Sequence, residues 1–87
     1  MTPEVIIYSS DYCGFCFRAR RLLESKQANI TELCVDEDHG LREKMMRKSG
    51  QRTVPQIWIG KQHIGGCDDL YQLDQSGKLD LLLYISK

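Results

Sequence analysis

The sequence lacks an excess of charge of either sign. Its 87 residues include 12 basic and 12 acidic side chains, so the formal net charge is zero. A balanced charge provides no overall field to attract a nucleic acid or an anionic membrane. The basic cluster Arg18-Ala19-Arg20-Arg21 is more typical of a solvated helix face than of a nucleic-acid site. We therefore expect no binding to nucleic acids or membranes.

The sequence also lacks long hydrophobic runs, repeats and low-complexity segments. Its first apolar run, Val5–Tyr8, is too short for the core of a signal peptide or for a membrane span. Hydrophobic residues nevertheless make up 41% of the chain, which is typical of a globular protein. We expect residues 1–87 to form a single domain in the cytoplasm.

Short apolar and polar blocks alternate along the chain and predict eight elements. Strands are expected over residues 5–9, 31–36, 56–59 and 62–64, and helices over residues 14–26, 40–48, 67–75 and 79–85. The first strand–helix–strand unit requires a parallel pair of strands, and the later hairpin adds antiparallel strands. The sequence thus predicts an α/β fold, a four-stranded mixed sheet with helices on both faces.

The motif Cys13-Gly14-Phe15-Cys16 lies where the first strand meets the first helix. The unpaired amides and the positive dipole of a helix N-terminus stabilise an anion, and the thiolate is the reactive form of cysteine. The spacing places Cys16 one turn into the helix and within reach of Cys13. We predict that Cys13 is exposed and attacks disulfides, and that a more buried Cys16 resolves the mixed disulfide. A Cys-x-x-Cys motif in this context is typical of a thioredoxin-like fold.

The sequence leaves two other interpretations of this cysteine pair open. An even number of cysteines in a small secreted chain indicates structural disulfides, whereas in a reducing compartment it points to catalysis or metal binding. A pair without any redox role is the first alternative. A zinc site is the second, but it needs four ligands, usually in two close pairs. Cys34 and Cys67 are isolated, and His39 and His63 do not form a pair.

A second motif, Thr53-Val54-Pro55, precedes an expected strand. Only about 5–6% of X–Pro bonds in folded proteins are cis, so a structural proline is the ordinary interpretation of these residues alone. Combined with the Cys-x-x-Cys motif upstream, the proline predicts a cis Val54–Pro55 bond opposite Cys13. The Val54 amide and carbonyl would then be free to pair with an extended peptide such as glutathione.

A third motif, Gly65-Gly66-Cys67-Asp68, opens an expected helix. Glycine allows close approach of the backbone to a ligand, and a helix N-terminus offers amides to a carboxylate. A simple turn followed by a helix cap explains the same residues equally well. This stretch alone leaves both interpretations open.

Together the three motifs resemble those of the glutaredoxin family, and the similarity extends from Val5 to Leu83. The resemblance implies a thioredoxin-like fold and a monomeric enzyme that reduces glutathione mixed disulfides and protein disulfides, with glutathione as reductant. It implies that Cys13 is the nucleophile and Cys16 the resolving thiol. The residues implied to hold glutathione are Phe15, Thr53, Val54, Pro55, Gly66, Cys67 and Asp68.

Two residues depart from the pattern of the dithiol members of that family. Gly14 stands where those members usually have proline, and Cys-Gly-Phe matches the monothiol members, which bridge an iron–sulfur cluster between two subunits. A second hypothesis is therefore a dimer that holds a glutathione-ligated [2Fe–2S] cluster with Cys13 as ligand. Ser10 stands where many relatives have a lysine. The absence of that lysine removes a cation near the thiolate. Gln51 and Arg52 are the candidates to compensate.

The remaining cysteines and aromatic residues predict ordinary packing. Cys34 lies in an expected strand, so we expect a buried apolar side chain. Cys67 is expected to be half-exposed and oxidisable, with its backbone as the functional part. Met45 fits the buried side of a helix, and Trp58 in the hairpin is expected to pack in the core.

Overall fold

The computed structural model describes residues 3–84. Its four strands form one sheet in the order β2-β1-β3-β4. The strands are β1 (Glu4–Ser9), β2 (Asn29–Cys34), β3 (Gln56–Ile59) and β4 (Gln62–Gly65), and the helices are α1 (Gly14–Ser25), α2 (His39–Ser49), α3 (Cys67–Gln75) and α4 (Lys78–Tyr84). β1 pairs with β2 in parallel, and the β1–β3 and β3–β4 pairs are antiparallel. The predicted mixed sheet and thioredoxin-like fold are confirmed.

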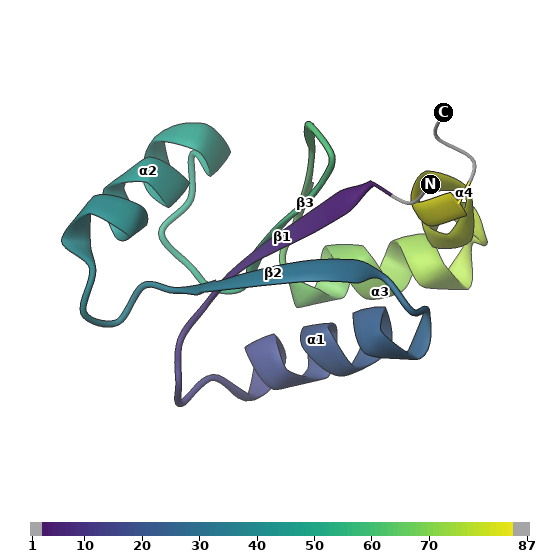
Figure 1. The fold of residues 1–87 in the computed structure, drawn as a ribbon, viewed down its shortest axis with the longest axis horizontal. Coiled ribbons are helices and arrows are strands. Elements are labelled where there is room, and N and C mark those ends of the chain that lie inside the picture. The colour runs from purple at the N-terminus through teal and green to yellow at the C-terminus, as the bar shows by residue number, and fades with distance from the viewer. Residues whose placement is uncertain (1–2, 85–87) are drawn as a thin grey trace.

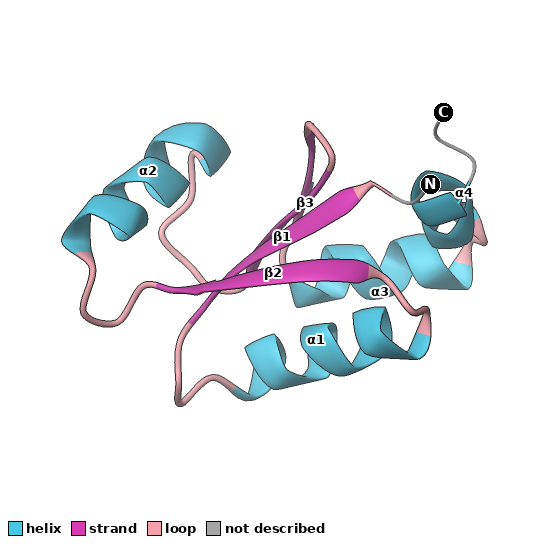
Figure 2. Cartoon of the chain, in the orientation of Figure 1, coloured by secondary structure: helices cyan, strands magenta, loops and turns pink. Residues whose placement is uncertain are grey.

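Helices cover both faces of this sheet (Figures 1 and 2). On one face, α1, α3 and α4 bury a core that includes Ile7, Leu23, Ile57 and Leu70. On the other face, α2 covers a smaller core formed by Tyr8, Val35, Met45 and Trp58. The packing of Met45 and Trp58 confirms their predicted burial.

Some predicted boundaries were wrong by a few residues. The second strand begins at Asn29, two residues before the predicted start at residue 31, and it ends at Cys34 instead of residue 36. It is longer at its start because β1 and β2 pair over their full length, from Glu4 with Asn29 to Ser9 with Cys34. The last helix was predicted to reach Ile85, a residue that lies outside the described part of the chain.

Capping residues define both ends of α2. Gly50 follows α2 with a φ of 72°, a left-handed conformation that favours glycine, and its amide donates to the Met46 carbonyl. At the start of α2, the Asp38 carboxylate accepts a hydrogen bond from the Leu41 amide at 3.0 Å. These caps set the length of the helix that covers the smaller core.

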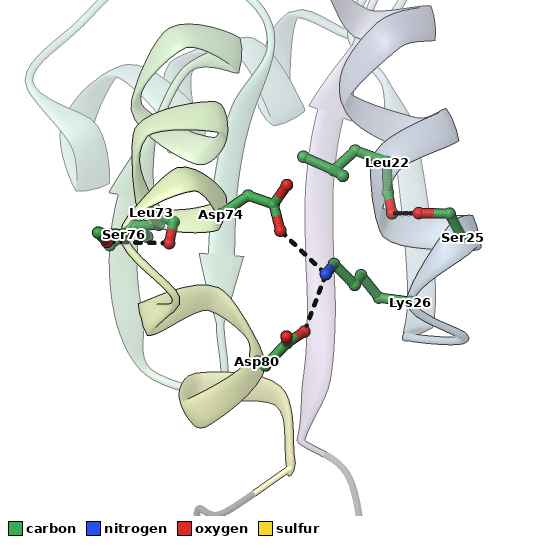
Figure 3. Close-up of polar contacts among 7 residues, drawn as sticks. All are labelled: Leu22, Ser25, Lys26, Leu73, Asp74, Ser76 and Asp80. Carbon is green, nitrogen blue, oxygen red and sulfur yellow. Dashed lines mark hydrogen bonds and ion pairs between the residues drawn. The ribbon is translucent and has the colours of Figure 1, made fainter.

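Lys26 links three helices on the face of the sheet that carries the larger core. This residue caps the end of α1, and its Nζ lies 2.9 Å from Asp74 Oδ1 in α3 and 3.0 Å from Asp80 Oδ1 in α4 (Figure 3). Hydrogen bonds to Asp74 and then to Asp80 raise the pKa of the Lys26 ammonium. The cation therefore joins segments that are distant in sequence.

Within residues 3–84, no helix combines the length and apolar character needed to cross a membrane.

Candidate active site

Cys13 lies at the junction of the β1–α1 loop and α1. It is the N-cap of the helix, and its Sγ accepts a hydrogen bond from the Cys16 amide at 3.1 Å. The Cys13 thiol donates to the Val54 carbonyl at 3.7 Å. The Cys13 side chain is partly exposed. A sulfur held against a helix amide in this way is suited to carry negative charge.

Cys16 is the buried member of the pair. Its exposed fraction is 3%, and it packs on the inner face of α1. Burial, together with a hydrogen bond to Cys13, raises the pKa of the Cys16 thiol to about 12. Cys16 is thus a neutral thiol near neutral pH. The difference in exposure agrees with the predicted contrast between an accessible and a buried cysteine.

A groove of about 220 Å³ runs beside the cysteine pair. Val54, whose carbonyl contacts Cys13, forms part of its wall. The structure brings together in this groove all seven residues predicted to hold glutathione: Phe15, Thr53, Val54, Pro55, Gly66, Cys67 and Asp68. Gln51 and Asp69 complete the lining. Residues from three distant parts of the chain therefore form one concave surface next to the thiols.

The Val54–Pro55 bond is cis, as predicted. The loop before β3 is held by Gln56, which is fully buried although it is polar. Its Nε2 donates to Gln51 Oε1, to the Thr53 carbonyl and to Thr53 Oγ1, at 3.1, 3.0 and 3.2 Å. Its Oε1 lies 2.8 Å from His63 Nε2. Gln56 thus positions the groove wall, a role that the sequence signals only by a polar side chain in an otherwise apolar strand.

The start of α3 forms the opposite wall of the groove. Gly65 has a φ of 116°, and a Cβ at this position would lie 2.3 Å from Asp69 Oδ2. The Asp69 carboxylate accepts a hydrogen bond from the Gly66 amide at 3.0 Å. No hydrogen-bond partner occurs among the described residues for the amides of Cys67 and Asp68, the first two of the helix. They are free to bind a carboxylate.

The Ser10 side chain is bound by Asp36, which lies in the loop that follows β2. Its hydroxyl donates to Asp36 Oδ1, and the Asp11 amide donates to Asp36 Oδ2 at 2.9 Å. The hydrogen bond from Ser10, followed by that from Asp11, lowers the pKa of the Asp36 carboxyl. Gln51 lines the groove, whereas Arg52 is not part of its lining. Of the two candidates to replace the lysine, only Gln51 reaches the groove.

Two expectations about the other cysteines were wrong. Cys34 is exposed, because its neighbours Leu33 and Val35 both face α2 and turn Cys34 to the other face, at the end of an edge strand. A hydrogen bond from the Asp36 backbone lowers the pKa of the Cys34 thiol, but desolvation and the nearby carboxylates outweigh it and raise the pKa. Cys67 is buried at 5% exposure, because its side chain packs into the larger core.

The fold and the two unlike thiols at a helix start define the class of protein, a thioredoxin-like thiol–disulfide oxidoreductase. Residues 5–64 match the model of the family described as Glutaredoxin. The chain is 53% identical over 80 residues to Glutaredoxin 3 of Escherichia coli K12, which covers 92% of this chain and 96% of the relative. The chain belongs to the glutaredoxin family and is an oxidoreductase.

Solved structures of the family are similar over most of the chain. The solution structure of a glutaredoxin from Brucella melitensis has a TM-score of 0.86 and 46% identity, and the match covers 99% of this chain and 94% of that one. The crystal structure of a buckwheat glutaredoxin–glutathione complex has a TM-score of 0.85 and 33% identity, with 94% and 76% covered. The shared fold therefore includes both walls of the groove.

Proposed function

We propose that this protein reduces glutathione mixed disulfides and protein disulfides with electrons from glutathione. The observation that carries the proposal is the groove beside Cys13, which gathers all seven predicted ligand residues. A peptide of extended shape would pair with the Val54 backbone, and a carboxylate would meet the free amides of Cys67 and Asp68. The similarity to a buckwheat glutaredoxin solved with glutathione supports the same ligand here.

In the proposed reaction, the Cys13 thiolate attacks the glutathione sulfur of a mixed disulfide. The protein thiolate leaves and takes up a proton, and a Cys13–glutathione disulfide remains. The thiolate of a second glutathione then attacks the glutathione sulfur of this intermediate. Oxidised glutathione is released and the Cys13 thiolate is restored. The helix N-terminus stabilises the negative charge on Cys13 at both ends of this cycle.

Reduction of a protein disulfide would require Cys16 as well. Cys13 attacks one protein sulfur, and Cys16, after losing its proton, attacks the Cys13 sulfur of the resulting mixed disulfide. The reduced protein leaves, and a Cys13–Cys16 disulfide is formed, which two glutathione molecules reduce. Burial is the largest cause of the raised pKa of Cys16, and contacts with Cys13 raise it further.

Serine variants of the two cysteines test these roles. Cys13→Ser should abolish both reactions, with a loss of at least about 100-fold, because it removes the nucleophile. Cys16→Ser should retain reduction of a small glutathione mixed disulfide and lose reduction of protein disulfides. Both rates are measured by coupling the formation of oxidised glutathione to glutathione reductase. Substantial activity of Cys13→Ser would contradict the assigned roles.

We also infer that the enzyme acts in the cytoplasm, on glutathione and on proteins. A reducing cytoplasm supplies reduced glutathione, which the reaction consumes, and it keeps unused thiols free. The partners are then glutathione and proteins that carry a disulfide or a bound glutathione.

A second function is favoured by one feature, the open space at Gly14. A Cβ at this position would meet no atom within 4 Å, so the surface beside Cys13 is uncrowded. The donor set fits a shared [2Fe–2S] cluster in part, because each chain offers one accessible thiol, Cys13, while Cys16 is buried. Such clusters need four thiolates. Two chains would supply two, and two glutathione molecules would supply the others.

The cluster proposal is tested by anaerobic reconstitution with iron, sulfide and glutathione. The expected result is a coloured dimer that is lost in Cys13→Ser and kept in Cys16→Ser. Gly14→Pro should suppress the cluster but retain reductase activity, because proline is tolerated at the first position of a helix while its ring occupies the open space. A protein that stays colourless and monomeric would overturn this second function.

A further inference from the structure

The surface beside Cys13 carries aromatic side chains that the protein leaves exposed. Tyr12 is fully exposed, and Phe17 is exposed by 50%. Both adjoin the cysteine pair: Tyr12 precedes Cys13 in the loop, and Phe17 lines a small hollow together with Cys13 and Cys16. Large exposed aromatic side chains next to a reactive group are typical of a contact surface.

Arginines of α1 surround one of these aromatic rings. The guanidinium carbons of Arg20 and Arg21 lie 5.4 and 5.7 Å from the centroid of the Phe17 ring. Arg20 is also paired with Glu32, with the two charged atoms 3.2 Å apart. Arg21 has no carboxylate within salt-bridge distance among the described residues. The α1 surface of Phe17, Arg20 and Arg21 thus offers an uncompensated positive charge beside an apolar ring.

The surface around Asp11 and Tyr12, in the loop that leads to Cys13, is acidic. A second hollow there is lined by carboxylates together with Tyr12, and its acidic residues are Asp11, Asp36, Glu37 and Asp38. An acidic partner is repelled from this hollow and attracted to α1. The acidic hollow and the arginines of α1 therefore favour a partner whose acidic residues lie over α1.

We propose that the α1 surface of Phe17, Arg20 and Arg21 is the docking site for the protein substrate, and that it favours acidic residues flanking the disulfide. This inference rests on the proposed function, because it assigns a surface to the protein partner of that reaction. When the substrate is a protein that carries a bound glutathione, that glutathione occupies the groove, and the protein itself contacts another surface next to Cys13. The α1 surface borders the hollow that contains both thiols. That hollow also contains Asp11 and Glu32, but Glu32 is paired with Arg20. Arg21, beside the Phe17 ring, has no such partner among the described residues.

The test uses two synthetic peptides with the same internal disulfide, one flanked by glutamates and the other by lysines. At low ionic strength, we expect kcat/KM to be about 5- to 10-fold higher for the acidic peptide, and we expect salt to remove most of the difference. Arg21→Glu should reverse the preference. The same variant should reduce a small glutathione mixed disulfide at the rate of the unmodified protein, because that substrate does not reach α1.

Arg47→Glu is the matched control, since Arg47 is an exposed arginine at the end of α2 and its reversal changes the net charge equally. It should leave the peptide preference unchanged. Equal rates for the two peptides, or equal effects of the two variants, would overturn the docking site. So would failure to reduce either peptide while the small mixed disulfide is reduced. Loss of the small-substrate reaction in the unmodified protein would instead contradict the proposed function.

Discussion

At the scale of single residues, two cysteines one turn apart differ in exposure, because one lies at the end of a loop and the other on the buried face of a helix. Cys13 Sγ is held by a helix amide at a partly exposed position, whereas Cys16 packs on the buried face of α1. The chemical asymmetry of the site thus follows from helix periodicity. A spacing of two residues between the cysteines is sufficient to separate an attacking thiol from a protected one.

The pKa of Cys16 predicts how the stability of the reduced protein changes with pH. This pKa is raised from 9.0 to about 12, so the neutral thiol stabilises the folded state fully below about pH 9. The contribution is lost as pH rises from about 9 to about 12, with a slope of at most about 1.4 kcal/mol per pH unit. Urea unfolding across this range should show a steeper decline for the unmodified protein than for Cys16→Ala.

Cys34→Ala is the control for this measurement, because Cys34 is an exposed thiol whose pKa is raised by less. It should change the slope less than Cys16→Ala does. Equal slopes for all three proteins would mean that Cys16 ionises in the folded state as readily as in the unfolded chain.

A second residue-scale prediction concerns Gly65. Its φ of 116° disfavours any side chain, and a Cβ would collide with the Asp69 carboxylate. Gly65→Ala should lower the free energy of unfolding by about 1–3 kcal/mol and weaken glutathione binding, since Asp69 also holds the Gly66 amide. Chemical denaturation and calorimetric titration with glutathione measure the two effects.

Gly77→Ala provides the comparison, because Gly77 also has a positive φ, of 80°, but a Cβ there would meet no atom within 4 Å. It should cost less stability than Gly65→Ala and leave glutathione binding unchanged. A Gly65→Ala protein as stable as the unmodified one would show that the turn has another accessible conformation.

At the scale of elements, Lys26 joins the end of α1 to α3 and α4 (Figure 3). Lys26→Met keeps the aliphatic stem but removes both ion pairs, so it should shift the urea midpoint downward. The shift should shrink in high salt, because partly exposed ion pairs are screened. Lys44→Met is the control, since Lys44 is exposed and has no ion pair among the described residues. Equal shifts for both variants would contradict the linking role.

At the scale of the whole molecule, local signals predicted the element order and the composition of the groove. The apolar runs of β1 and β3 are continuous, and the three motifs carry their own loop and helix-start residues. The predicted burial of Cys34 was wrong because an edge strand has two unlike faces. Only the packing of Leu33 and Val35 against α2 shows which face of the strand is covered. The role of Gln56 depends on partners in the folded loop, and the pattern of a strand cannot indicate them.

The chain's single tryptophan belongs to the smaller core, where its ring packs against Tyr8 at 5.4 Å and His63 at 4.6 Å between centroids. Its fluorescence is therefore an optical reporter of the α2 side alone. Local unfolding of α1 and α3 would change the far-ultraviolet circular dichroism and leave the indole emission nearly constant. The two signals together distinguish partial opening around the catalytic thiols from complete unfolding, without any label.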